Sequence, residues 1–166
     1  MPTSQKLEAN SMWELISQSY TNITKQGSGS FGVVYKASCK KTRKDVAIKY
    51  IELVPNDVIY LKKTVSEIQI LKKLTEQPNN IYTTKIYDLI VPETADDEPI
   101  TWVVLVMDFV SSDLRTVLNH ARNIELQESH VTTIMFNMLS ATEFLHSKNL
   151  MHRDIKPANF LVDDEC

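Results

Sequence analysis

The sequence predicts an α+β fold in which a small antiparallel sheet with one helix precedes a mainly helical segment. Two kinds of pattern support this class. β-prone apolar runs lie within residues 33–53 and 81–107, whereas apolar residues recur at helical spacing within 57–74 and again within 128–147. The length of 166 residues suits one domain.

Residues 1–19 form an N-terminal extension that is polar apart from Met12, Trp13, Leu15 and Ile16. Such a cluster fits either a short docking helix or a frayed chain end. Chain ends are commonly poorly ordered unless they are tied to the rest of the fold. We therefore expect a frayed end here.

A glycine-rich segment follows, with the sequence Gly27-Ser28-Gly29-Ser30-Phe31-Gly32-Val33-Val34. Glycines let backbone amides approach phosphate oxygens closely. Similar spacing occurs in dinucleotide-binding turns and in loops that bind nothing. A dinucleotide-binding turn opens into a helix, however, whereas residues 33–38 are β-prone. We therefore expect two strands, one before and one after a phosphate-covering loop.

The next strand, predicted at residues 46–53, contains Val46-Ala47-Ile48-Lys49, and the helix predicted at 57–74 contains Glu67. A lysine in a strand usually faces solvent, so a functional Lys49 needs a carboxylate that holds it in place. Glu67 is the candidate, although a glutamate on a helix is ordinarily a solvated surface charge.

Further strands are predicted near residues 81–91 and 100–107, on either side of an acidic, proline-bounded loop at 92–99. We interpret that loop as a solvated turn. A short helix at 113–120 and a longer one at 128–147 follow. The longer helix is apolar over much of its circumference, so we expect it to need neighbours on several sides.

The segment His152-Arg153-Asp154-Ile155-Lys156-Pro157-Ala158-Asn159 carries the strongest chemical signal. Asp154 suits a group that orients a hydroxyl and accepts its proton, and Asn159 offers a neutral oxygen for Mg²⁺. Lys156 balances developing negative charge, while Pro157 prevents a regular helix and favours a loop. Taken singly, these residues would be a charged surface loop with ion pairs worth about 0–1 kcal/mol. The ordered set favours phosphoryl transfer.

In this order the motifs resemble those of eukaryotic protein kinases of the serine/threonine class, and most of all the mitogen-activated protein kinases. They match the patterns Gly-x-Gly-x-x-Gly-x-Val, Val-Ala-Ile-Lys and His-Arg-Asp-Leu-x-x-x-Asn, with Ile155 replacing leucine. Lys156, two residues after Asp154, resembles the serine/threonine class. The likeness to mitogen-activated protein kinases is carried by Tyr20-Thr21-Asn22, by residues 86–90 and by residues 108–114.

The resemblance implies a truncated kinase domain at residues 20–166, with an N-lobe at 20–106, a hinge at 107–112 and the start of a helical C-lobe at 113–166. The implied activity is transfer of the γ-phosphate of ATP to protein serine or threonine in signalling. ATP and Mg²⁺ are the implied cofactors. Protein substrates and an upstream activating kinase are the implied partners.

The resemblance also assigns site residues. Asp154, Lys156, Lys49 and Glu67 carry catalysis, and Asn159 binds the metal. The nucleotide contacts come from the glycine-rich segment, the sheet, the hinge and the C-lobe: Gly27, Ser28, Gly29, Ser30, Phe31, Gly32, Val34, Ala47, Lys49, Met107, Asp108, Val110, Asp113 and Leu161. The resemblance implies that the base is bonded by backbone groups of Asp108 and Val110, and that Asp113 touches the ribose.

Two features depart from the kinase pattern. Gln26 stands where kinases usually carry an aliphatic residue over the base, which would loosen the edge of the adenine pocket. No Asp-Phe-Gly motif occurs in the sequence, and the pattern places it just beyond Cys166. We therefore interpret the chain as an incomplete copy of a kinase, with weak nucleotide binding and negligible phosphoryl transfer by itself. The alternative is a catalytically inactive interaction module, which has no need for the charged motif residues present here.

Composition limits the other function classes. A net charge of −3 supplies no bulk attraction to nucleic acid or to an anionic membrane. The two cysteines, Cys39 and Cys166, suggest neither a disulfide framework nor a zinc site. We expect no signal peptide, no membrane span, and an intracellular protein of the cytoplasm or nucleus.

Overall fold

The computed structural model describes residues 12–29, 32–95, 98–120 and 126–163. The chain divides into two compact units. The first contains Met1–Gln77 and Thr84–Phe109, and the second contains Pro78–Thr83 and Val110–Cys166.

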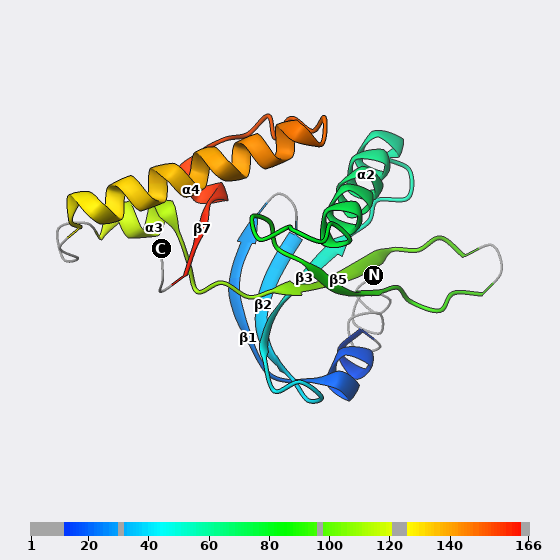
Figure 1. Cartoon of the computed structure of the whole chain (residues 1–166). Helices are drawn as coiled ribbons and strands as arrows, with labels where there is room; N and C mark the ends of the chain where they lie inside the picture. Colours follow the sequence, from blue (N-terminus) through cyan, green and yellow to red (C-terminus); the bar gives the residue numbers. More distant parts are fainter. Residues whose placement is uncertain (1–11, 30–31, 96–97, 121–125, 164–166) are drawn as a thin grey trace. The chain divides into compact units, whose positions relative to one another are not determined.

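The first unit is built on a five-stranded antiparallel sheet in the order β1-β2-β3-β5-β4 (Figure 1). The strands are β1 (Tyr20–Gly29), β2 (Gly32–Cys39), β3 (Asp45–Glu52), β4 (Ile86–Ile90) and β5 (Trp102–Asp108). The pairing of β1 with β2 confirms that strands lie on both sides of the glycine-rich segment.

A strand was predicted near residues 81–91, but β4 begins only at Ile86. The prediction was therefore wrong for residues 81–85. The preceding residues form a turn around Asn80, whose side-chain oxygen accepts the backbone N–H groups of Tyr82 and Thr83. An asparagine that bonds the backbone of the following residues competes with strand pairing. The apolar and β-branched composition of this segment concealed that competition.

Helix α2 (Val58–Thr75) packs on one face of the sheet. Asp57 caps it, because its carboxylate accepts the backbone N–H of Tyr60 at 2.9 Å. Tyr60 and Ile68 of the helix pack against a cluster formed by Ile51, Val103 and Leu105. The helix predicted at residues 57–74 is confirmed.

A second helix, at residues 12–19, covers the opposite face of the sheet. Met12, Ile16 and Tyr20 are spaced four residues apart and are only 4%, 0% and 7% exposed, within a cluster that includes Ile48 and Val104. The expectation of a frayed end was therefore wrong for residues 12–19. Burying each large apolar side chain contributes about 1.5–3 kcal/mol, which offsets the cost of ordering a short helix.

The second unit contains two helices and a small two-stranded sheet. Its elements are β6 (Ser112–Asp113), α3 (Leu114–Asn119), α4 (Glu128–Ser147), the 3₁₀ helix η1 (Pro157–Asn159) and β7 (Leu161–Val162). β6 pairs with β7 in antiparallel fashion, and the backbone N–H of Leu114 donates to the Phe160 carbonyl at 2.8 Å. The two helices predicted here are confirmed to within about a residue.

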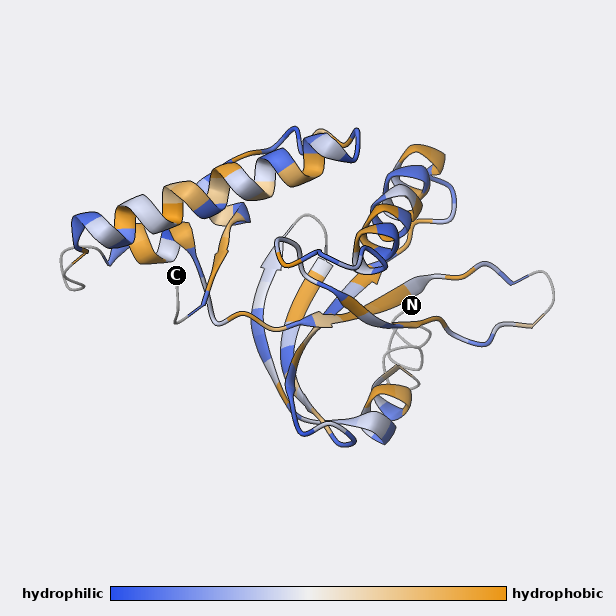
Figure 2. Cartoon of the chain, viewed as in Figure 1, coloured by the Kyte–Doolittle hydropathy of each residue, from blue (hydrophilic) through white to orange (hydrophobic). Residues whose placement is uncertain are grey.

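Helix α4 carries apolar residues over much of its circumference (Figure 2). Four of its large apolar side chains are at least half exposed: Val131, Met135, Phe136 and Leu139. None of the helix's residues is fully buried. Within the described ranges, no helix is both long enough and apolar enough to span a bilayer.

Candidate functional site

One face of the five-stranded sheet gathers four residues of the predicted nucleotide site. The strand register pairs Val34 with Lys49 and Ala47 with Met107. Directly paired residues share a face, as do residues two apart along a strand. Val34, Ala47, Lys49 and Met107 therefore lie on the same face, which is also the face that carries Leu105 and packs on α2.

Lys49 and Glu67 form an ion pair on this face. The Nζ of Lys49 lies 2.6 Å from Oε1 of Glu67, and the side chains are 15% and 39% exposed. Lys49 comes from β3 and Glu67 from α2, so the packing of the helix on the sheet brings the charges together. The result is an ammonium group with a defined position, as recognition of an anionic phosphate requires.

The glycines of the predicted phosphate loop differ in whether the fold would tolerate a side chain at their positions. Gly32 has φ of +113°, and a Cβ atom there would lie 2.0 Å from the carbonyl oxygen of Tyr50. The fold therefore requires glycine at position 32. A Cβ atom at Gly27 or Gly29 would meet nothing within 4 Å. Ser30 and Phe31, also predicted here, lie outside the described residues.

The second unit holds the predicted Asp154 loop. Lys156 Nζ lies 2.8 Å from Oδ2 of Asp154, and the Asn159 side-chain nitrogen donates to the same oxygen at 2.9 Å. That nitrogen also donates to the Asp154 backbone carbonyl at 2.7 Å. The backbone N–H of Asp154 donates to Nδ1 of His152 at 3.3 Å. The three predicted residues of this loop are thus in direct contact.

These contacts control the charge of Asp154. The hydrogen bond from Lys156 and then that from Asn159 hold the pKa of the Asp154 carboxyl below its usual range, so the group is ionised at neutral pH. Both bonds go to Oδ2, and among the described residues Oδ1 accepts none. One oxygen of the carboxylate is therefore positioned while the other is accessible.

The local backbone explains this arrangement. Arg153 has φ of +64°, in the left-handed region that non-glycine residues seldom adopt. Pro157 then begins the single turn of η1, which brings Asn159 back to Asp154. The expectation that Pro157 prevents a regular helix is confirmed, since only a 3₁₀ turn forms.

Two further predicted residues of the second unit are paired directly. Asp113 of β6 lies opposite Leu161 of β7. The Asp113 carboxylate accepts the backbone N–H of Thr116 at 2.8 Å and so caps α3. Its predicted ribose contact would share the carboxylate with this cap. Val110 lies two residues before β6 and has no regular secondary structure.

One arrangement was not foreseen from the sequence. The Asp108 side chain, predicted to act only through its backbone, accepts a hydrogen bond from the Tyr87 hydroxyl. Its other carboxylate oxygen accepts the backbone N–H of Lys85 at 2.7 Å. Tyr87 and Asp108 are 21 residues apart and meet only through the pairing of β4 with β5. No local sequence signal indicates this contact.

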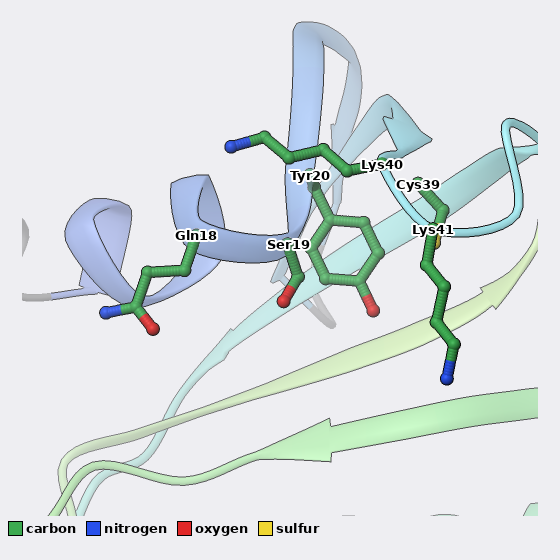
Figure 3. Close-up of a pocket in the computed structure, with 6 residues that line it drawn as sticks. All are labelled: Gln18, Ser19, Tyr20, Cys39, Lys40 and Lys41. Carbon is green, nitrogen blue, oxygen red and sulfur yellow. The ribbon is translucent and has the colours of Figure 1, made fainter.

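Two hollows of the first unit differ in their relation to the predicted nucleotide contacts. The hollow in Figure 3, of about 400 Å³, lies where the 12–19 helix meets the turn after β2. It contains none of the predicted site residues and is lined by Gln18, Ser19, Tyr20, Cys39, Lys40 and Lys41. A second hollow, of about 360 Å³, adjoins the glycine-rich segment at Gly29 and Gly32.

Asn159 and Asp154 both offer oxygen atoms that could contact a metal ion. Among the described residues, no group of three or more histidine, cysteine, aspartate or glutamate side chains could hold a metal ion. Asn159 bonds Asp154 through its amide nitrogen, so its amide oxygen is not used in those contacts. A neutral oxygen beside an ionised carboxylate suits a hard cation that keeps several waters, such as Mg²⁺.

Comparison with known proteins gives a consistent set of relatives. A family model described as "Protein kinase domain" matches residues 20–166. Mitogen-activated protein kinase 15 of Mus musculus is 34% identical over 151 residues, which are 91% of this chain and 26% of the mouse protein.

Two further relatives cover similar parts of the chain. Extracellular signal-regulated kinase 2 of Dictyostelium discoideum is 33% identical over 147 residues, which are 89% of this chain and 37% of that protein. Cell division control protein 2 homolog 2 of Trypanosoma brucei brucei is 33% identical over 144 residues, which are 87% of this chain and 38% of that protein. The chain thus spans well under half the length of these relatives.

Proposed function

This chain belongs to the protein kinase family, and we propose that it binds ATP with Mg²⁺ and serves transfer of the γ-phosphate to a serine or threonine hydroxyl of a protein. The proposal places it in signalling of the mitogen-activated protein kinase type, with an upstream activating kinase as a partner. The similarity to mitogen-activated protein kinase 15 and extracellular signal-regulated kinase 2 supports this assignment.

The observation that carries the proposal is the one-sided bonding of Asp154. Lys156 and Asn159 both contact Oδ2, which fixes the carboxylate plane and keeps the group ionised. Oδ1 is then the oxygen that accepts a hydrogen bond from an incoming hydroxyl. A carboxylate held in this way orients the hydroxyl and takes its proton as the new bond to phosphorus forms. Lys156 offsets the negative charge that develops on the transferred phosphoryl group.

The first unit carries the residues that we assign to binding of the nucleotide phosphates. The Lys49 ammonium, held by Glu67, donates to phosphate oxygens on the face that also carries Val34 and Ala47. The fold itself does not require glycine at positions 27 and 29, since a Cβ atom there would meet no protein atom within 4 Å. Their lack of side chains suits close approach of a phosphate to the backbone.

The metal would be held by Asn159 through its amide oxygen. Bound Mg²⁺ would neutralise charge on the phosphate oxygens and help to orient them. Asp154 accepts both hydrogen bonds from the amide nitrogen of Asn159 and thereby orients the amide oxygen as well. The described residues supply few metal ligands, so waters and nucleotide oxygens would complete the coordination.

Nucleotide binding provides the first test. The affinity of the chain for ATP with Mg²⁺ is measured by calorimetry for the wild type, Lys49→Met and the control Lys62→Met. Removing a charged hydrogen bond should weaken ATP binding about 10–100-fold in Lys49→Met. Lys62 lies exposed on α2 and its variant should match the wild type. A folded chain that binds ATP equally well in all three forms would refute the assigned nucleotide site.

Phosphoryl transfer is tested separately, with radiolabelled ATP and a general protein substrate. We expect little transfer by the 166-residue chain itself, and any phosphate that is transferred should appear on serine or threonine and disappear in Asp154→Asn. Phosphate on tyrosine would contradict the assigned acceptor class. Failure of a well-folded chain to bind nucleotide at all would favour the alternative, a catalytically inactive interaction module.

A further inference from the structure

The end of β5 is tied to β4 by the side chain of Asp108. Its two carboxylate oxygens accept the Tyr87 hydroxyl and, at 2.7 Å, the backbone N–H of Lys85. The backbone N–H of Asp108 also donates to the Lys85 carbonyl at 3.1 Å. Three hydrogen bonds therefore hold Asp108, which is the last residue but one of the first unit before the second unit resumes at Val110.

The position of Tyr87 arises from an irregularity in strand pairing. Ile86 pairs with Met107 and Asp88 pairs with Val106, so Tyr87 is an extra residue without a paired position opposite it. Such a bulge redirects a side chain relative to a regular strand. Here the Tyr87 side chain remains 56% exposed, but its hydroxyl contacts Asp108. At the bulge, the Tyr87 side chain therefore contacts Asp108 and is not packed into the core.

The electrostatics keep this contact intact over the neutral range. The hydrogen bond to Asp108, followed by partial burial, raises the pKa of Tyr87 to about 12. The hydroxyl thus retains its proton and remains a donor at neutral and moderately alkaline pH. The Tyr87 hydroxyl donates its hydrogen bond to the carboxylate of Asp108. Hydrogen bonds to a charged acceptor are stronger than those between neutral groups.

The following residue is held by a different strand. Lys36 of β2 places its Nζ 4.6 Å from the centre of the Phe109 ring, within the range of a cation–π contact. The same Nζ lies 2.8 Å from a carboxylate oxygen of Asp45. Asp108 is therefore contacted by a side chain of the adjacent strand β4, and Phe109 by a side chain of β2, which is two strands away from β5. Both end the first unit, immediately before Val110.

We propose that Tyr87 is a positioning residue that holds Asp108 so that the backbone of residues 108–110 is presented for hydrogen bonding to the adenine base. The inference rests on the proposed function, because these backbone groups meet a base only if the chain binds ATP. Tyr87 acts through Asp108 and does not touch the nucleotide. It therefore affects recognition of the base rather than of the phosphates.

The test compares Tyr87→Phe with Tyr35→Phe, which removes a hydroxyl that donates no hydrogen bond among the described residues. Affinities for ATP and GTP are measured with Mg²⁺. We expect Tyr87→Phe to weaken ATP binding about 3–10-fold, as loss of one hydrogen bond implies. The preference for ATP over GTP should fall by a similar factor, because the two bases present different donors and acceptors. Tyr35→Phe should leave both affinities unchanged.

Asp108→Asn adds a conservative variant, because its amide retains one acceptor oxygen of the original two. We expect its loss of ATP affinity to be at most that of Tyr87→Phe. An equal loss of ATP and GTP affinity in Tyr87→Phe would show general destabilisation and would overturn the positioning role. Unchanged affinities in Tyr87→Phe would overturn it as well.

Amide hydrogen exchange without nucleotide separates this inference from the proposed function. The backbone N–H of Asp108 should exchange several-fold faster in Tyr87→Phe than in the wild type or Tyr35→Phe. If the wild type binds no nucleotide but exchange accelerates, the proposed function fails while the hold of Tyr87 on Asp108 is supported. If exchange is unchanged, the hold itself is refuted, whatever the nucleotide result.

Discussion

The sheet of the first unit and helix α4 of the second both contain many large apolar side chains, but these side chains differ in burial. Ile48, Leu105, Val104 and Val106 of the sheet are 0% exposed, because helices pack on both faces. In α4, four large apolar side chains, including Phe136, are at least half exposed, and no residue of the helix is fully buried. An apolar pattern therefore establishes what a segment can bury. Whether it is buried depends on which other elements pack against it.

The largest effect expected from this contrast comes from Ile48→Ala. The side chain is fully buried in β3, so its truncation should lower the free energy of unfolding by about 2–5 kcal/mol. Phe136→Ala, at a site that is 68% exposed on α4, should change it by less than about 0.5 kcal/mol. Urea unfolding followed by circular dichroism measures both. Equal losses would mean that α4 is buried in solution.

A somewhat smaller effect is expected from Ile16→Ala in the 12–19 helix. Ile16 is 0% exposed and joins the same cluster as Ile48, so we expect a loss of about 2–4 kcal/mol. Leu15, its neighbour on the helix, is 39% exposed and provides the matched control. Leu15→Ala should cost much less in the same urea experiment. If both variants unfolded like the wild type, the 12–19 helix would not belong to the core.

The smallest effect concerns the exposed Asp154 loop. Lys156→Met removes the principal cause of the lowered pKa of Asp154, so that pKa should rise toward its ordinary value. A depressed pKa in the folded state stabilises the fold above the ordinary carboxylate range, and this contribution is lost as the pH falls through the folded-state pKa. NMR titration of the Asp154 side-chain carbon follows the shift. An unchanged pKa would mean that Lys156 does not contact Asp154 in solution.

Most elements were predictable because their signals are local. The helix at 128–147 was predicted with the bounds that α4 has, and the Lys49–Glu67 contact followed from motif and helix spacing. The 12–19 helix was missed although Met12, Ile16 and Tyr20 are spaced four residues apart. So short a helix is unstable in isolation, and its stability comes from packing against the sheet face that it covers.

The sequence by itself determined the kinds of chemistry and their order along the chain. Short motifs identify the glycine-rich segment, the lysine in β3 and the Asp154 loop, because a few neighbouring residues suffice to build each of them. Only the tertiary structure decided which side chains meet across the chain. The bulge at Tyr87 that reaches Asp108 depends on the register between β4 and β5, and pairing of distant strands follows from the packing of the whole sheet rather than from local pattern.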